Sequence, residues 1–154
     1  MNKLKKIPLL SSLFFLVLIG CNNNDDKNSS QNSDEIALLS QETKKVVEHH
    51  LEAFIQGDVD KTLEDYTDDS VLISEGINEQ GYVKGLAQIR ANFENVYANY
   101  FPPTTTNFTL ETMTVSGETA HITWTSATTD YTTDTFVVRN GKIVAQTFAA
   151  KYKQ

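Results

Sequence analysis

Cysteine and arginine are scarce in this chain of 154 residues. Cys21 is the only cysteine, so no disulfide can form within the chain and the fold must depend on its hydrophobic core. The only arginines are Arg90 and Arg139, and lysines cluster only in the first six residues. The net charge of -7 becomes about -10 once residues 1–20, with three lysines and no acid, are removed. This excess of negative charge argues against binding to nucleic acid.

The motifs of common metal and cofactor sites are also missing from the sequence. It contains no His-x3-His or Cys-x2-Cys pair, and the adjacent His49 and His50 point in different directions on a helix. It contains no glycine-rich phosphate loop, no dinucleotide fingerprint and no G-x-S-x-G. We therefore expect neither a metal site nor a cofactor.

The one long apolar run lies at the N-terminus, from Ile7 to Ile19. It is too short to span a membrane comfortably and follows three lysines, which is typical of a secretory signal peptide. Its end, Leu18-Ile19-Gly20-Cys21, resembles the lipobox of bacterial lipoproteins. The resemblance implies that residues 1–20 are a lipoprotein signal peptide and that Cys21 is lipidated, with palmitate among its acyl chains. The alternative is an ordinary signal peptide followed by a chance cysteine.

The residues that follow Cys21 are polar as far as Asp34 and Glu35. A segment without apolar side chains cannot pack, so we expect residues 21–35 to form a flexible tether and residues 36–154 to form one folded domain. A lipid on Cys21 would hold this domain on the extracytoplasmic side of a membrane in a bacterial cell envelope.

Apolar residues at a period of 3.6 predict three helices at the start of the domain. The first begins near Ser33 or Ser40 and ends at Gly57, and Asp58 caps a second, short helix. The third runs from about Leu86 to Tyr100. The inner face of the first helix is predicted to carry Val47, Leu51, Phe54 and Ile55, with His49 solvated on the other side.

His50 lies on the apolar face of the first predicted helix. Val46 and Phe54 are four residues away on either side of it, and Val47 is three residues before it. A buried polar group without a partner costs about 1–3 kcal/mol, so we expect one ring nitrogen to be bonded. The role of His50 stays open among catalytic group, ligand contact and core residue, and the candidate partners are Tyr66, Tyr97 and Asp134.

From Thr104 onward the pattern changes to a period of two, rich in threonine, valine and aromatic residues. Ser116-Gly117 and Asn140-Gly141 are hairpin signals. The pattern predicts an antiparallel sheet of four or more long strands, with one face on the helices and the other partly wet.

Three stretches in this order resemble the nuclear transport factor 2-like (NTF2-like) superfamily and its SnoaL-like group: FIQGDVDKTLEDYTDDSVLI, VKGLAQIRANF and VVRNGKIVAQ. The resemblance covers about residues 40–152. It implies an α+β cone, in which three N-terminal helices pack on a strongly curved antiparallel sheet of four to six strands. It also implies a homodimer through the outer face of the sheet, and a pocket at the open end of the cone. The pocket lining would be His50, Tyr66, Phe93, Tyr97, Trp124, Phe136 and Phe148, with Asp134 or Thr135 near the mouth.

The resemblance leaves two classes of function open. Ketosteroid isomerases share this fold, but their catalytic positions fall here on His50, Ser74 and Thr135, which do not reproduce the required set. We favour a lipid-anchored module that binds a small apolar molecule or a protein partner in or beside the pocket. The alternative is a small acid–base enzyme of the isomerase, polyketide cyclase or dehydratase type, with His50, Asp134 and Tyr66 as catalytic candidates.

Overall fold

The computed structural model describes residues 24–154, so Cys21 and the predicted signal peptide lie outside the described residues. The chain forms three helices and six strands in the order α1 (Asn24–Gln56), α2 (Val59–Leu63), β1 (Val71–Ser74), β2 (Tyr82–Lys84), α3 (Gly85–Asn99), β3 (Thr109–Ser116), β4 (Thr119–Thr125), β5 (Thr129–Arg139) and β6 (Lys142–Tyr152). Among residues 24–154, no helix is long and apolar enough to cross a membrane.

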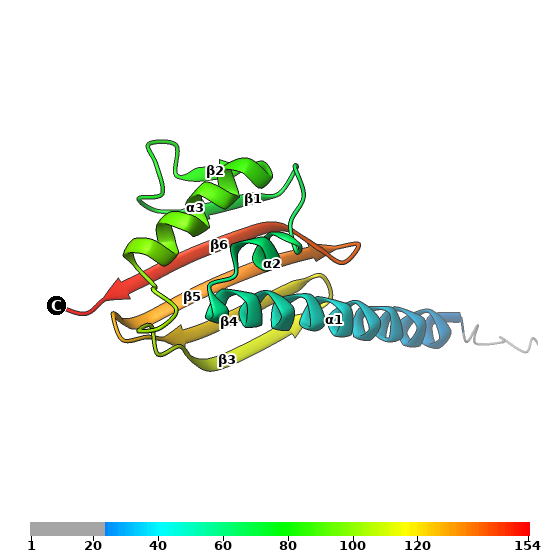
Figure 1. Ribbon diagram of the computed structural model, residues 1–154. Helices are drawn as coiled ribbons and strands as arrows, with labels where there is room; N and C mark the ends of the chain where they lie inside the picture. Colours follow the sequence, from blue (N-terminus) through cyan, green and yellow to red (C-terminus); the bar gives the residue numbers. More distant parts are fainter. Residues whose placement is uncertain (1–23) are drawn as a thin grey trace, which may run out of the picture.

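The six strands form one curved sheet in the order β2-β1-β6-β5-β4-β3. Helix α1 contacts β3, β4 and β5, and α3 contacts β1 and β2, so the helices cover one face of the sheet (Figure 1). The predicted α+β architecture is confirmed, with one difference: β1 runs parallel to β6, so the sheet is mixed. Between β1 and β6 the chain passes through α3 and the other strands, which supplies the long connection that a parallel pair requires.

The start of α1 was predicted wrongly. The helix begins at Asn24 instead of Ser33 or Ser40, and Ser40 lies inside it, where its hydroxyl donates to the carbonyl of Ile36 at 2.7 Å. The segment between Asn22 and Gln56 contains no glycine or proline, and each residue added to an existing helix costs little once the packed part has formed. Residues from Asn24 onward are therefore helical, while the assignment of 21–35 as a spacer stays a prediction.

The junction between α1 and α2 follows the sequence prediction. Gly57 ends α1 at φ +70°, and a Cβ at this position would clash with the ring of Pro103. Both the backbone conformation and the space thus require glycine. Asp58 caps α2, because its carboxylate accepts a hydrogen bond from the backbone N–H of Lys61 at 3.0 Å. The turn directs α2 back across α1, as the contacts between these two helices show.

The core lies between the helices and the concave face of the sheet. Val47, Leu51 and Phe54 of α1 are buried as predicted, but Ile55 is 46% exposed. One residue beyond Phe54, Ile55 is rotated by about 100° around the helix and leaves the inner stripe. Tyr100, placed on the buried side of the third helix by its spacing, is also 46% exposed, since it follows the last residue of α3.

Candidate functional site

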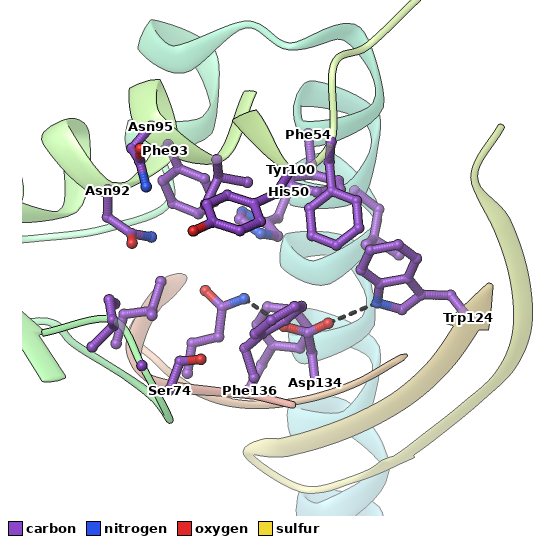
Figure 2. Close-up of a pocket in the computed structure, with 18 of the residues that line it drawn as sticks. His50, Phe54, Ser74, Asn92, Phe93, Asn95, Tyr100, Trp124, Asp134 and Phe136 are labelled. Atoms are coloured by element: carbon purple, nitrogen blue, oxygen red, sulfur yellow. Dashed lines mark hydrogen bonds between the residues drawn. The ribbon is translucent and has the colours of Figure 1, made fainter. Parts of the chain in front are cut away.

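A cavity of about 310 Å³ opens between the concave face of the sheet and helices α1 and α3 (Figure 2). Its wall is rich in aromatic side chains, which are Phe54, Phe93, Tyr100, Phe101, Phe108, Trp124, Phe136, Phe148 and Tyr152. A concave, mostly apolar cavity with a few polar groups is the usual form of a small-molecule site.

Five of the seven residues predicted to line a pocket do border this cavity: His50, Phe93, Trp124, Phe136 and Phe148. The other two, Tyr66 and Tyr97, are buried behind it and are not among its lining residues. The Tyr66 hydroxyl donates to the side-chain oxygen of Gln146, and the Tyr97 hydroxyl lies 3.1 Å from that of Thr62. The hydroxyl groups of both tyrosines are therefore bonded within the protein.

Asp134 is a buried carboxyl in the cavity wall, 4% exposed. It lies on β5 between two neighbouring strands, and its side chain accepts a hydrogen bond from each of them. Trp124 Nε1 on β4 donates to Oδ2 at 2.8 Å, and Gln146 Nε2 on β6 donates to Oδ1 at 2.8 Å (Figure 2). Burial raises the pKa of Asp134 from 3.8 to about 6, although these two donors act in the opposite direction. A carboxyl group with this pKa can exist in either form near neutral pH.

Gln146 is a cavity residue that the sequence analysis did not name. It connects Asp134 to Tyr66, which donates to its other amide atom. Its inward position could have been inferred, because it lies two residues before Phe148 on a predicted strand. Counting from buried Ile143 would have failed, since β6 contains an extra residue between Ile143 and Ala145 that reverses the alternation.

His50 is 2% exposed and borders the cavity, as the helix periodicity predicted. Its ring contacts are aromatic: the centroids of Tyr66, Phe93 and Phe136 lie 5.5, 5.9 and 5.3 Å from the imidazole centroid. Burial, followed by the charge of His49, lowers the pKa of His50 from 6.5 to about 3, so the ring is neutral at physiological pH.

The prediction that a ring nitrogen of His50 bonds to a buried side chain was wrong. None of Tyr66, Tyr97 or Asp134 bonds to it, because the first two bond to Gln146 and Thr62, and Asp134 bonds to Trp124 and Gln146. Among the described residues, Nδ1 of His50 is the only buried side-chain nitrogen or oxygen without a hydrogen bond.

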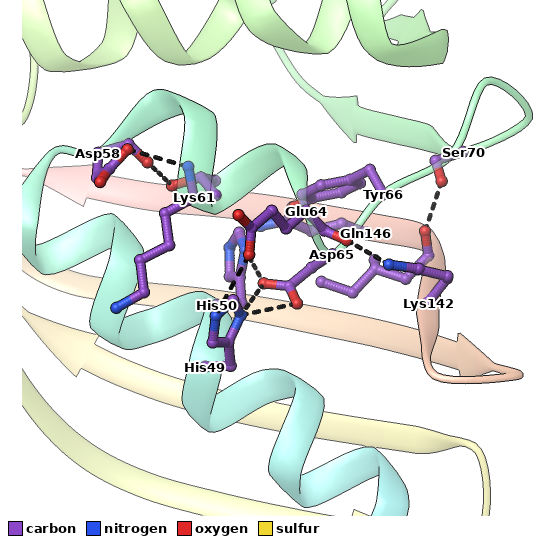
Figure 3. Close-up of polar contacts among 12 residues, drawn as sticks. His49, His50, Asp58, Lys61, Glu64, Asp65, Tyr66, Ser70, Lys142 and Gln146 are labelled. Atoms are coloured by element: carbon purple, nitrogen blue, oxygen red, sulfur yellow. Dashed lines mark hydrogen bonds and ion pairs between the residues drawn. The ribbon is translucent and has the colours of Figure 1, made fainter.

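His49 was predicted to be solvated, but it contacts two acidic side chains. Its Nδ1 lies 2.9 and 3.0 Å from the two carboxylate oxygens of Asp65, and its Nε2 lies 3.9 Å from Glu64 (Figure 3). Both acids belong to the turn that follows α2, which folds back onto α1. Helical periodicity places a residue on a side of its own helix but does not reveal which element covers that side.

The mouth of the cavity carries polar side chains, of which the sequence analysis considered only Ser74. Asn92 and Asn95 lie on α3, and Ser74 is the last residue of β1 (Figure 2). Glu75, the next residue along the chain, also belongs to the lining. The lining residues in the described part of the chain include no lysine or arginine. Because nothing in the wall offsets a negative charge, the cavity suits a neutral molecule better than an anion.

The described residues contain no group of three or more histidine, cysteine or acidic side chains arranged to hold a metal ion. The chemistry available in the wall is therefore that of a neutral imidazole, a carboxyl group with a raised pKa, and amide and hydroxyl groups. Such groups can orient a polar ligand atom or transfer a proton to or from it.

Comparisons with known proteins agree with this fold. A SnoaL-like protein of Burkholderia thailandensis E264 superposes with a TM-score of 0.60 at 16% identity, over 74% of this chain and 96% of that one. An NTF2-like protein of Mesorhizobium loti gives a TM-score of 0.60 at 20% identity, over 73% and 93%. A de novo designed protein with a curved β-sheet gives 0.59 at 17% identity, over 72% and 86%. These identities show a shared fold alone.

No curated protein matches the sequence. The model of the SnoaL-like domain matches residues 47–146, which contain both His50 and Asp134 and the whole cavity wall except Phe148 and Tyr152. The match covers more than half of the chain, and the cone and its cavity fit the same assignment. The chain belongs to the SnoaL-like domain family, within the NTF2-like fold.

Proposed function

We propose that the domain binds a small, neutral, mostly apolar molecule in the cavity between α1, α3 and the sheet. The observation that carries the proposal is an aromatic cavity of about 310 Å³ with His50 and Asp134 in its wall and no cationic lining residue in the described part of the chain. The aromatic side chains supply contact area, and the few polar groups supply orientation. A protein partner beside the mouth is the other occupant that the sequence suggested.

Three naphthalene probes of similar size test this proposal. Because Trp124 is the only tryptophan and borders the cavity, its fluorescence reports occupancy. We expect 2-naphthol and 2-methoxynaphthalene to quench it saturably, and 2-naphthoate to bind at least about tenfold more weakly, since burying an unpaired carboxylate is costly. A Phe136→Ala variant, altered only in the wall, is the matched variant and should shift the affinity for the two neutral probes.

Preferred binding of 2-naphthoate, or quenching that never saturates, would contradict the proposal. The first outcome would mean that a cation outside the described lining contributes to the site. The second would mean that the aromatic cavity is closed to molecules of this size.

A second candidate function is acid–base catalysis. It is favoured by one observation: His50 and Asp134 border the same cavity, with the pKa of His50 lowered to about 3 and that of Asp134 raised to about 6. Titratable groups whose pKa values their surroundings shift in opposite directions are typical of acid–base sites. The two functions differ in the fate of a natural ligand, because a binding module releases it unchanged and an enzyme releases an isomer or dehydrated product.

We also propose that Cys21 anchors the domain to a bacterial envelope membrane, on the evidence of its lipobox-like context. Growing cells supplied with a fatty-acid analogue should label the wild-type protein and not Cys21→Ala, which should move to the soluble fraction. Lys27→Ala, a change in the same segment, is the control and should label normally. Equal labelling of wild type and Cys21→Ala would end this proposal.

A homodimer through the outer face of the sheet stays a prediction. That face carries a Thr-rich surface in which Thr112 and Thr123 of neighbouring strands bond at 2.7 Å and both side chains lie near solvent.

A further inference from the structure

The unpaired Nδ1 of His50 faces a carboxylate. The nearest acidic atom is Oδ2 of Asp65, 3.9 Å away, which is too long for a hydrogen bond but makes this carboxylate the negative group closest to Nδ1 (Figure 3). Both groups are shielded from solvent, His50 at 2% exposure and Asp65 at 6%. Beside this carboxylate, Nδ1 is more stable with a proton than with a lone pair, because a lone pair would face a negatively charged oxygen.

Asp65 is held in this position from several sides. His49 Nδ1 bridges its two oxygens at 2.9 and 3.0 Å, and its backbone carbonyl accepts from the N–H of Ile143 at 2.8 Å. The other charged groups nearby are Glu64 and Lys142, and Lys142 Nζ donates to the carbonyl of Glu64 at 2.5 Å. The carboxylate therefore has little freedom to turn away from His50.

The other ring nitrogen of His50 has a different environment. Nε2 is not among the buried atoms that lack a partner, and no side chain or carbonyl of the described residues bonds to it. Since the ring borders the cavity, Nε2 is the nitrogen that a ligand can reach. The proton on a neutral imidazole resides on one nitrogen only, so the environment of Nδ1 decides the character of Nε2.

We propose that Asp65 is a positioning residue that keeps the proton of neutral His50 on Nδ1, so that Nε2 accepts a hydrogen bond from a hydroxyl group of the ligand. This inference rests on the proposed function for its ligand and narrows that ligand to a neutral, mostly apolar molecule with a hydroxyl donor. His49 supports the arrangement from the solvent side by fixing the carboxylate.

The tautomer of His50 can be measured without any ligand. In the purified full chain, ¹⁵N–¹H correlation spectra of the histidine rings distinguish a protonated from an unprotonated nitrogen, and His50→Gln assigns the signal. We expect a protonated Nδ1 and an unprotonated Nε2 in the wild type. In Asp65→Asn the proton should move partly or wholly to Nε2, whereas Glu64→Gln, the neighbouring neutralised acid, should leave it on Nδ1.

A wild-type spectrum with the proton on Nε2 would overturn the proposal, whatever the variants do. An Asp65→Asn protein that folds and keeps the proton on Nδ1 would overturn it as well. If Asp65→Asn does not fold, Asp65→Glu retains the charge and should retain the wild-type tautomer.

The ligand preference gives an independent measurement. Wild type should bind 2-naphthol about 3- to 10-fold more tightly than 2-methoxynaphthalene, which lacks the donor, and Asp65→Asn should lose most of this preference. Glu64→Gln should keep it. If neither probe binds to the wild type, the proposed function fails while the tautomer still decides the role of Asp65. If both bind equally to the wild type, Nε2 is not the acceptor and the inference fails.

Discussion

Acidification from pH 7 to pH 3 should cost the wild-type protein roughly 4–5 kcal/mol of unfolding free energy through His50 alone. In the unfolded chain His50 gains a proton near its ordinary pKa of 6.5, while in the folded protein burial lowers that pKa to about 3. Between these values the unfolded state binds more protons. The stability is therefore fully present above pH 6.5 and falls as the pH falls.

Two variants separate this titration from the packing of the ring. His50→Gln and His50→Leu both remove the titrating group, so both should show the same difference from wild type in the slope of stability against pH. At pH 7 His50→Leu should be as stable as wild type or more so, because Nδ1 is buried without a hydrogen bond and such a group costs about 1–3 kcal/mol. Urea unfolding at pH 7, 5.5 and 4 measures these differences. Parallel curves for wild type and both variants would show that the pKa of His50 is the same in the folded and the unfolded protein, as for a ring open to solvent.

The sequence was sufficient to predict that His50 faces inward, but not what it meets there. Its position follows from Val46, Val47 and Phe54, which belong to the same helix and have fixed spacing. Its neighbour Asp65 comes from the turn after α2, and the approach of that turn depends on how the two helices pack. Local periodicity contains no information about such contacts between elements.

The same distinction, between local sequence patterns and contacts between elements, explains the other differences between the predicted and the observed structure. The end of α1 could be predicted because Gly57 terminates the helix and Asp58 caps the next one. Its start could not, because no glycine or proline between Asn22 and Gln56 marks where the helix begins. β1 pairs in parallel with β6, with Val71 opposite Ala145, and this pairing depends on tertiary packing that local sequence patterns do not reveal. Inward positions on β4 and β5 followed from alternation, but the extra residue in β6 reverses alternation there, and no local sequence signal marked it.

The cavity was predicted better than its polar network. Aromatic residues at alternating strand positions face one side of a sheet by geometry, so Trp124 and Phe136 could be placed from the sequence. The bonds of Asp134 to Trp124 and Gln146 join three strands diagonally, and they require the register between strands to be known. The raised pKa of Asp134 depends on burial and could not be inferred from residue type.

Asp134→Asn should stabilise the protein at neutral pH by up to about 3 kcal/mol. Burial raises the pKa of Asp134 from 3.8 to about 6, so between these values the native state holds a proton that the unfolded state has lost. Stability falls as the pH rises through this range, and the cost is complete above pH 6. Asparagine never ionises and removes that cost.

The gain in stability expected for Asp134→Asn depends on how many of the hydrogen bonds of Asp134 the new side chain keeps. The amide in Asp134→Asn offers one acceptor oxygen where the carboxylate offers two, so either Trp124 Nε1 or Gln146 Nε2 loses its partner unless the Gln146 amide rotates. Rotation presents the Gln146 oxygen to the new amide and its nitrogen to the Tyr66 hydroxyl, which can also accept. Asp134→Leu offers no acceptor and should destabilise the protein at pH 5 by about 2–5 kcal/mol. This variant is the control that separates lost hydrogen bonds from lost ionisation.

Between pH 4 and pH 6 the two residues therefore have opposite effects on stability: the titration of His50 lowers it as the pH falls, and that of Asp134 lowers it as the pH rises. The pKa of His50 is set by burial and His49, and that of Asp134 by burial and its own hydrogen bonds, so the two titrations can be treated as independent. Relative to wild type, His50→Gln should gain stability as the pH falls, and Asp134→Asn should gain it as the pH rises. The double variant should show both gains, added to within about 0.5 kcal/mol if the sites do not interact. Urea unfolding of the four proteins at pH 4, 5, 6 and 7 decides the matter. A change of the same sign in both single variants would contradict the assigned pKa shifts, and gains that do not add in the double variant would show that the two groups titrate as a coupled pair.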